Sequence, residues 1–356
     1  GALDHRLRDG HGPKKTNPLP LDVPALTEVL RSAGYYTALG CGFHDKTDLN
    51  FDPRTKLFEG KDWSLRKPGQ PFFAQITLGS THPGSPWGQL LQGSPKISPD
   101  SVKLPPHFLD IPQSRKWFAD YLSIIQYMDG EFKMIVDRID AEGLRDNTIV
   151  IFIGDNGSSM IRGKEWLYDA GLHVPLLVRW PGNIKPKSVF SGLVSMLDVT
   201  AGMAKVGSGS VPKHMDGVSL FDSKFRGRSF IAASRGRSDE MRDSIRCMRT
   251  KEYKYIRNFM PQLGYQLSRY ALYVHPHLKP MQEAYDQGAL NAAQSQYFVS
   301  PKPTEELYDI KADPYELTNL ASDPDRREQL MDGRKKMTAW LKEIGDPLAA
   351  EVTLLS

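Results

Sequence analysis

The stretch Asn147–Gly157 reads NTIVIFIGDNG, and the rest of the fold can be predicted outward from it. Its centre, Ile149–Ile153, is continuously apolar, as is typical of a strand covered on both faces. Between Tyr121 and Glu142 apolar residues recur at helical spacing, and Gly143 is the residue at which this helix should end. A helix that leads into a fully buried strand is the repeating unit of an α/β fold.

Four more segments extend this pattern. Asp22–Ala33 has the apolar spacing of a helix, and Tyr35–Gly40 directly after it reads as a strand. Pro71–Leu78 and Pro175–Trp180 are short apolar runs of the kind found in buried strands. We therefore predict an α/β fold whose main sheet is mostly parallel, doubly wound and flanked by helices.

The sequence changes character after about Pro212. Within Ser244–Phe259 (SIRCMRTKEYKYIRNF) apolar and charged residues alternate, which predicts antiparallel strands with one face in water. A terminal amphipathic helix is expected near Arg326–Ile344. We predict two domains: an α/β domain over residues 1–225, and a smaller C-terminal α+β domain with an antiparallel sheet over residues 226–356.

Composition excludes several classes of protein. The 356 residues carry a formal net charge of +4, too small an excess to indicate a surface for nucleic acid. Two cysteines are too few for a disulfide framework. No run approaches the ~18 apolar residues of a membrane span, and the opening residues GALDHRLRDGHGP lack the apolar core of a signal peptide. A small anionic substrate is compatible with the mildly basic charge.

Polar side chains follow three of the predicted strands. His44 comes after the first, His82 after the second, and Asp155 and Asn156 directly after the third, with Lys164 close behind. The carboxyl ends of parallel strands meet at one edge of a sheet, where α/β proteins bind their ligands. The Asp-Asn pair offers hard oxygen ligands that suit calcium or magnesium. The lysine and the two imidazoles suit an oxyanion such as sulfate or phosphate.

Each of these residues also has a simpler structural explanation. Asp-Asn-Gly is a common turn sequence, because Asp and Asn tolerate left-handed backbone. A histidine after a strand is often a loop residue without a catalytic role, and Lys164 alone could be a solvated charge. Their shared placement, rather than any one of them, favours a site for an anion and a cation.

Longer motifs in the chain resemble the sulfatases of the alkaline phosphatase superfamily. The resemblance is carried by RGKEWLYDAGLHVPLLVRWPG joined to DNTIVIFIGDNG, and by LTEVLRSAGYYTALGCGFH, PFFAQITLGSTHP and ELYDIKADPYELTNLASDP in the family's order. These motifs extend over nearly the whole chain. Within the family, SIRCMRTKEYKYIRNF looks most like the heparan N-sulfatase (sulfamidase) branch.

The resemblance implies a sulfatase that hydrolyses O- or N-linked sulfate from a saccharide such as a glycosaminoglycan fragment. Asp155 and Asn156 match the family's metal-binding pair, for Ca²⁺ or possibly Mg²⁺ as the cofactor. Lys164 matches the lysine that grips the sulfate, His82 the histidine beside that lysine, and His44 the histidine near the nucleophile. These three are the catalytic candidates.

The family's nucleophile is a formylglycine made from Cys or Ser in a Cys/Ser-x-Pro/Ala-x-Arg motif that precedes all these elements. Cys41 and Cys247 do not lie in such a motif and are expected to be small buried apolar residues. The family's N-terminal aspartate pair, which supplies further calcium ligands, is not found either. We therefore expect the nucleophile, that pair and a core strand to lie N-terminal to Gly1.

The chain departs from the family in the element before His44. The family places a lysine where this chain has Gly42, and Lys46 is a candidate to reach the same place. The segment ASRGRSDEMRDSIR corresponds to a region near the saccharide in sulfamidase-like enzymes, although it could equally be a solvated charged loop. The remaining substrate-binding candidates come from this segment: Arg235, Arg237, Asp239 and Glu240.

Two alternatives remain open at this point. A relative that binds sulfated glycan without hydrolysing it is favoured by Gly42 and by the missing motif. A phosphodiesterase or phosphonate hydrolase of the same superfamily is disfavoured, because such sites carry more metal-binding Asp and His. The resemblance implies a periplasmic, secreted or lysosomal protein, and it indicates no oligomeric state.

Overall fold

The computed structural model describes residues 18–20, 22–47, 49, 51–236, 241–265 and 269–353. The chain divides into two compact units, Gly1–Gly79 with Ser191–Ile231, and Ser80–Phe190 with Ala232–Ser356. Each unit is therefore built from two separate stretches of sequence. The domain boundary at residue 225 stays a prediction.

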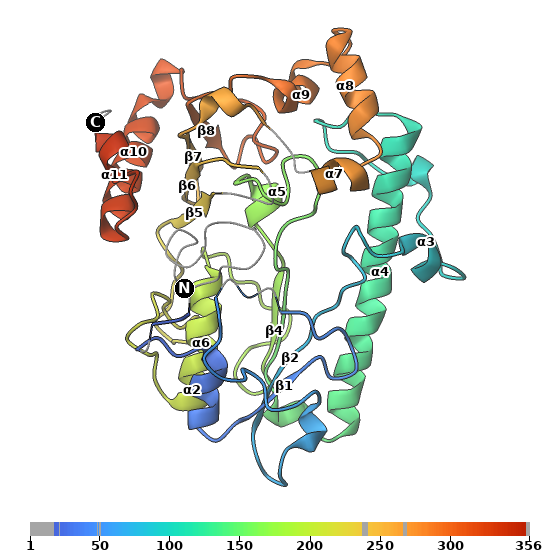
Figure 1. Ribbon diagram of the computed structural model, residues 1–356, viewed down its shortest axis with the longest axis vertical. Helices are drawn as coiled ribbons and strands as arrows, with labels where there is room; N and C mark the ends of the chain where they lie inside the picture. Colours follow the sequence, from blue (N-terminus) through green and yellow to red (C-terminus); the bar gives the residue numbers. More distant parts are fainter. Residues whose placement is uncertain are drawn as a thin grey trace. The chain divides into compact units, whose positions relative to one another are not determined.

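The first unit pairs two parallel strands with two helices that pack on each other (Figure 1). Its elements are α2 (Leu26–Ser32), β1 (Tyr36–Leu39), the 3-10 turn η1 (Trp63–Leu65), β2 (Phe72–Gln75) and α6 (Met196–Ser208). Strands β1 and β2 run parallel, with Tyr36 opposite Phe72 and Leu39 opposite Gln75. Gly207 of α6 lies so close to Leu30 of α2 that a Cβ there would come within 2.2 Å of the leucine Cδ2.

The start of α6 is fixed by a buried carboxylate. Ser195 caps the helix by accepting a hydrogen bond from Leu197 N, and the Ser195 amide donates to Asp198 Oδ2 at 2.9 Å. Asp198 is completely buried, and Arg228 binds both of its oxygens, with Nε–Oδ2 at 2.8 Å and Nη2–Oδ1 at 2.5 Å. One side chain thus joins the helix start to the segment around Arg228.

The second unit holds the remaining elements. They are α3 (Trp87–Leu90), η2 (Pro99–Ser101), α4 (Pro112–Ala141), η3 (Arg145–Asn147), β3 (Val150–Ile153), α5 (Asp169–Leu172), β4 (Leu176–Arg179), β5 (Ile231–Arg235), β6 (Ile245–Arg249), β7 (Tyr253–Asn258), η4 (Pro261–Leu263), α7 (Arg269–Val274), α8 (Leu278–Asp286), α9 (Ala292–Ser295), η5 (Gln296–Phe298), β8 (Glu305–Asp309), η6 (Pro324–Arg326), α10 (Arg327–Glu343) and α11 (Ala349–Thr353).

Helix α4 covers the strand that follows it, as predicted. Phe132 of α4 packs against Phe152 of β3, with ring centroids 5.1 Å apart. The helix begins at Pro112, nine residues before the predicted start at Tyr121. A proline at the first helical position costs no hydrogen bond, so the helix can start there, and the added turns bring Trp117 into the core.

The α/β class is confirmed, but the orientation of one predicted strand is wrong. Strand β4 runs antiparallel to β3, with Val150 opposite Arg179 and Ile153 opposite Leu176. A parallel neighbour needs a crossover, usually a helix of several turns. The segment between β3 and β4 contains only the four-residue helix α5, so the chain folds back beside β3.

The C-terminal antiparallel sheet is confirmed, with strand order β5–β6–β7–β8. Its predicted wet face is wrong, because Arg246, Lys254 and Glu306 are all buried. Helix α10 packs on β6 and β7 (Figure 1), where Gly333 allows the helix to approach the Tyr255 side chain. Trp166, Leu167 and Tyr168 cluster with residues of the sheet. Charged residues on this sheet therefore face protein rather than water.

Among the described residues, none of the helices combines the length and the apolar character that a membrane crossing requires.

We expect Asp198→Ala to lower the free energy of unfolding by about 3 kcal/mol, because it leaves the Arg228 guanidinium without its buried partner. The half-exposed pair Lys205–Asp222, which also involves α6, is the matched control. Asp222→Ala should barely change the melting temperature, because surface ion pairs contribute little. Calorimetry of both variants checks this, and equal shifts in melting temperature would contradict it.

Candidate functional site

The segment between β3 and β4 is a closed loop that carries three of the predicted site residues. The Gly157 amide donates to the Gly171 carbonyl at 3.0 Å, and the Lys164 amide donates to the Ser158 carbonyl at 2.6 Å. A Cβ on Gly157 would lie 1.9 Å from the Ala170 carbonyl oxygen, so this closure requires glycine. The loop holds the Asp155–Asn156 pair at one end and Lys164 further along.

Asp155 and Asn156 are arranged as oxygen donors. Asp155 is exposed, and its Oδ1 accepts from the Asn156 amide at 2.9 Å. The Asn156 side-chain nitrogen donates to the Gly157 carbonyl at 2.7 Å, which leaves the amide oxygen as the atom that can bind a cation.

The pair fits a calcium ion in the kind of ligand but not in number. Calcium takes about 6–8 oxygen ligands. Among the described residues, no group of three or more His, Cys, Asp or Glu side chains is placed to hold a metal. The two oxygens of Asp155 and Asn156 are therefore part of a ligand set at most.

His44 lies in the first unit, at the carboxyl ends of β1 and β2. The Thr77 amide donates to the His44 carbonyl at 3.3 Å, and the imidazole lies beside Gly79. Its Nδ1 accepts from the Lys46 amide at 3.1 Å, so the neutral ring carries its proton on Nε2. The parallel pairing thus places His44 beside Thr77 and Gly79, which follow β2. The meeting of His44 with His82, Asp155, Asn156 and Lys164 at one edge stays a prediction.

His82 lies in the second unit, in the loop before α3. Its Nδ1 accepts from the Gly84 amide at 3.2 Å, and its carbonyl accepts from the Trp87 indole at 3.0 Å. The ring is exposed, with Nε2 as the protonated nitrogen of the neutral form. His82 therefore belongs to the same unit as Lys164, whereas His44 and Lys46 belong to the other.

Arg235 is placed differently from an open substrate-binding residue. It is 6% exposed, its guanidinium stacks over the Trp166 ring at 3.9 Å, and its Nη1 lies 3.8 Å from Asp243 Oδ2. Burial lowers the pKa of Arg235, the reverse of what its acidic neighbours favour. The side chain thus supports Trp166, two residues beyond Lys164. The other candidates of this segment, Arg237, Asp239 and Glu240, lie outside the described residues.

A buried charged cluster, which sequence reasoning missed, holds the loop from behind. Lys254 of β7 is fully buried, with its ammonium 2.7 Å from Asp169 Oδ1 and 2.8 Å from Glu316 Oε1. Arg249 of β6 binds Asp169 Oδ2 at 2.9 Å. The sequence signal for this cluster is the alternation of charged and apolar residues in Tyr253–Asn258, which by itself predicts a face in water.

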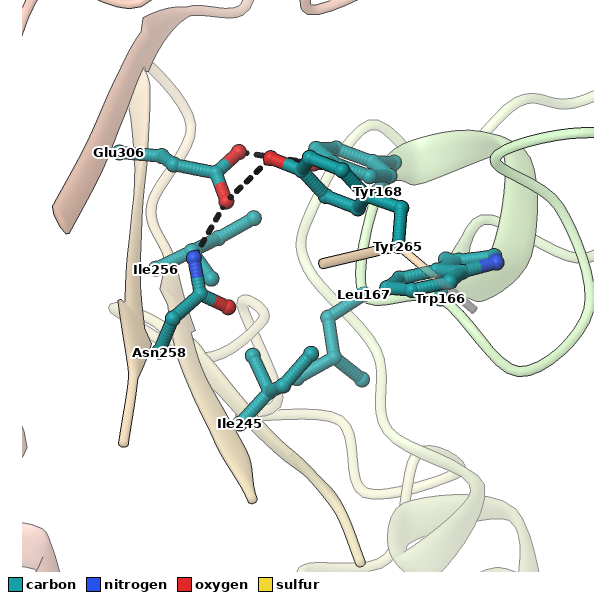
Figure 2. A pocket seen from close by; sticks show the side chains of 8 residues that line it. All are labelled: Trp166, Leu167, Tyr168, Ile245, Ile256, Asn258, Tyr265 and Glu306. Carbon is teal, nitrogen blue, oxygen red and sulfur yellow. Dashed lines mark hydrogen bonds between the residues drawn. The ribbon is translucent and has the colours of Figure 1, made fainter. Parts of the chain in front are cut away.

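A second buried carboxylate joins the loop to the same sheet. Glu306 Oε2 accepts from Tyr168 at 2.7 Å and from Tyr308 at 2.5 Å, while Oε1 accepts from Asn258 at 2.6 Å and from Tyr265 at 3.2 Å. Figure 2 shows Glu306, Tyr168 and Asn258 converging beside Trp166 and Leu167. The hollow between these side chains leaves no room for a water molecule, so it is a packed junction rather than a ligand pocket.

A cluster of histidines packs behind the middle of the loop. His275 and His277 are buried against Trp117, and Phe108 stacks near His277 with ring centroids 5.2 Å apart. Met160 of the loop joins Phe108 and Trp117 in one apolar cluster. Burial lowers the pKa of His275 to about 4 and that of His277 to about 3, so both are neutral near pH 7.

Neither cysteine is suited to be a nucleophile. Cys41 and Cys247 are both buried, as predicted, and burial raises the pKa of the Cys247 thiol to about 12.

A literal match to the nucleophile motif does occur, which the sequence analysis missed: Ser322–Arg326 reads SDPDR. There Asp323 caps η6 by accepting from the Asp325 amide, and Arg326 pairs with Asp309 at 3.4 Å. These residues lie between β8 and α10, and the side chains of Asp323 and Arg326 have structural roles.

Comparison with known proteins places these features in a family. The family model described as "Sulfatase" matches residues 44–209, and the model "N-sulphoglucosamine sulphohydrolase, C-terminal" matches residues 157–297. The chain is 30% identical to an ulvan-active sulfatase of Formosa agariphila over 92% of this chain and 61% of that protein. It is 25% identical to the N-sulphoglucosamine sulphohydrolase of Homo sapiens over 73% of this chain and 55% of that protein.

A solved structure shows the same fold. It was determined in complex with D-glucosamine-2-N,6-O-disulfate, and it matches 97% of this chain and 86% of its own with a TM-score of 0.62 at 14% identity. The two curated relatives are longer than this chain, which spans about three fifths of their length.

We expect the melting temperature to fall as the pH drops from about 6.5 toward 4. Over this range the unfolded state protonates the buried histidines and the folded state does not, so stability is lost at up to about 1.4 kcal/mol per pH unit for each histidine. His277→Phe should flatten the dependence measured by calorimetry. Phe108→Leu, which removes contacts but no titrating group, should lower stability at every pH without flattening it. An unchanged slope in His277→Phe would contradict the prediction.

Proposed function

The chain belongs to the sulfatase family, and on that premise we propose that it hydrolyses O- or N-linked sulfate from a saccharide. The observation that carries the proposal is the closed loop after β3. It presents a carboxylate, an amide oxygen and a lysine within one short segment, Asp155–Lys164. In it the Gly157 amide donates to the Gly171 carbonyl, and the Lys164 amide donates to the Ser158 carbonyl. Such a segment can hold a cation and an oxyanion side by side.

Lys164 is proposed to grip the sulfate. Its ammonium would hold a sulfate oxygen and offset the charge that develops on the departing sugar atom, a contribution that is largest where the donor is already fixed. Asp155 and Asn156 are proposed to supply ligands for a divalent cation, Ca²⁺, with Mg²⁺ as the alternative. When bound, the cation supplies positive charge next to the sulfate oxygens.

The two histidines, His44 and His82, are proposed to act on different groups in the reaction. His82, with its proton on Nε2, is suited to donate a hydrogen bond to the sulfate or the leaving atom. His44 carries its proton in the same way and is proposed to act near the nucleophile. That nucleophile, a formylglycine by family resemblance, is proposed to lie outside these 356 residues. Both cysteines are buried, and Asp323 and Arg326 of the Ser322–Arg326 match are engaged in a helix cap and an ion pair.

The proposed substrate is a sulfated polysaccharide fragment. The relatives named above act, by their names, on ulvan and on N-sulphoglucosamine, and the solved structure holds a disulfated glucosamine. Arg237, Asp239 and Glu240 are proposed to contact the saccharide, and Arg235 to act there through Trp166. A protein with this substrate is proposed to work in the periplasm, outside the cell or in a lysosome.

A second candidate is a protein that binds sulfated glycan without cleaving it, and Gly42 favours this reading. Gly42 has a φ of +91° with open space around it, a conformation that a lysine would adopt only with strain. Lys46, whose side chain is exposed, is proposed to take over from the family's lysine. Glycan binding without sulfate release would support this second candidate.

We expect Lys164→Ala to lower kcat/KM for an aryl sulfate by about 10²–10³, the usual loss when one fixed donor to developing charge is removed. Lys116→Ala, on the exposed face of α4, is the control and should leave turnover unchanged. Release of sulfate is followed by ion chromatography, with the matching aryl phosphate assayed in parallel. Faster turnover of the phosphate would point instead to a phosphodiesterase.

Removal of calcium with EGTA should abolish sulfate release, and added Ca²⁺ should restore it more fully than Mg²⁺. Asp155→Asn should weaken Ca²⁺ binding in titration calorimetry by at least tenfold, because a charged ligand becomes a neutral one. Undiminished Ca²⁺ affinity in this variant would remove Asp155 from the proposed ligand set.

A further inference from the structure

We propose that Lys254 is a positioning residue for this site, acting through Asp169 and Glu316 on the loop that carries Asp155, Asn156 and Lys164. The inference rests on the proposed function for what the loop does, but not for how the loop is held. Lys254 belongs to the segment Ser244–Phe259, whose residues have no assigned role in the reaction, and its side chain is fully buried.

The first step is the geometry around Lys254. Its ammonium lies 2.7 Å from Asp169 Oδ1 and 2.8 Å from Glu316 Oε1. The Asp169 amide donates to Glu316 Oε2 at 2.5 Å, and Arg249 holds the second oxygen of Asp169 at 2.9 Å. Burial by itself would raise the pKa of Asp169, but the bonds from Arg249 and Lys254 lower it to about 2. Asp169 is therefore charged, whereas burial raises the pKa of Glu316 against the opposing effect of the Lys254 ammonium.

The second step leads from Asp169 to the metal-binding pair. Asp169 opens helix α5, which ends at Leu172. Gly171 in this short helix accepts the hydrogen bond from the Gly157 amide, and Gly157 directly follows Asn156. A displacement of α5 would therefore move the Asp155–Asn156 pair.

The third step leads from the cluster to Lys164. Gly171 also packs against the Gly163 carbonyl, which a Cβ on Gly171 would approach to 2.4 Å. The Glu316 carbonyl accepts a hydrogen bond from Arg162, whose guanidinium stacks over Tyr168 at 3.6 Å. Gly163 and Arg162 directly precede Lys164, so both contacts restrict its backbone.

Lys254 contacts both residues from which these two series of contacts start, since its single ammonium binds the carboxylates of Asp169 and Glu316. Asp169 opens α5, and the backbone carbonyl of Glu316 accepts the hydrogen bond from Arg162. The ammonium comes from β7, which contributes no residue to the proposed site. Replacing it with an apolar residue would leave the two carboxylates facing each other, and like charges at such a distance repel. The loop would then shift while the sheet remains covered by α10.

The test compares full-length variants that break equally buried ion pairs. Lys254→Met removes the proposed positioning charge, and Glu316→Gln weakens it while keeping the shape of the side chain. Asp346→Ala, the control, breaks the buried pair Arg246–Asp346, whose atoms lie 2.9 Å apart. Arg246 also donates to the backbone carbonyl of Arg235, and it is Arg235 that stacks on Trp166. Melting temperature, kcat and KM for an aryl sulfate, and hydrogen exchange of residues 157–171 are measured for each.

We expect Lys254→Met to lower kcat by about 100-fold, as misplacement of site residues by about 1 Å does, with a smaller change in KM. The kcat of Glu316→Gln should lie between that of Lys254→Met and that of the wild type. Lys254→Arg should retain a higher kcat than Lys254→Met. Asp346→Ala should lower the melting temperature while leaving kcat within threefold. Exchange at residues 157–171 should rise in Lys254→Met but not in Asp346→Ala.

Two results would overturn the inference: equal loss of kcat in Lys254→Met and Asp346→Ala, or unchanged exchange of the loop in both Lys254→Met and Glu316→Gln. If the wild type releases no sulfate from any substrate, the proposed function fails instead. The exchange measurement then still decides whether Lys254 positions the loop.

Discussion

The hydrogen bond from the Gly157 amide to the Gly171 carbonyl is the constraint on which the candidate site depends. It brings the two ends of an irregular segment together with no room for a side chain at Gly157. A loop without regular structure is ordinarily a poor place for fixed functional groups. Here the closure and the buried charges behind it give Asp155, Asn156 and Lys164 a rigid support.

The local features of this site could be predicted from sequence because they depend on neighbours in the chain. The apolar run before Gly154 and the polar residues after it marked a strand end, and the structure has β3 there. The parallel pairing of β1 with β2 followed from similar runs. The reversal of β4 did not, because it depends on how far the segment before it folds back, which periodicity does not record.

The buried charges show where sequence patterns stop being informative. Alternation in Tyr253–Asn258 predicted a face in water, since charged residues are rarely buried unless paired. The partners of Lys254 are Asp169 and Glu316, each more than sixty positions away along the chain, so no local window contains them. The same holds for Arg235, whose neighbour Trp166 is equally remote in sequence. The sequence predicts that His44 and His82 each follow a strand. Their tautomers are defined by hydrogen bonds that Nδ1 accepts from the Lys46 and Gly84 amides.

The packed junction around Glu306 has a consequence for how such proteins can be recombined. Its carboxylate comes from β8, whereas Tyr168, one of the hydroxyls that satisfy it, comes from the loop between β3 and β4. A chimera that takes the loop from one relative and the C-terminal sheet from another would separate a buried acid from its matched donors. Loop and sheet therefore form one structural unit in this chain, and a chimera should keep the buried acid paired only when its crossover points leave both on the same parent.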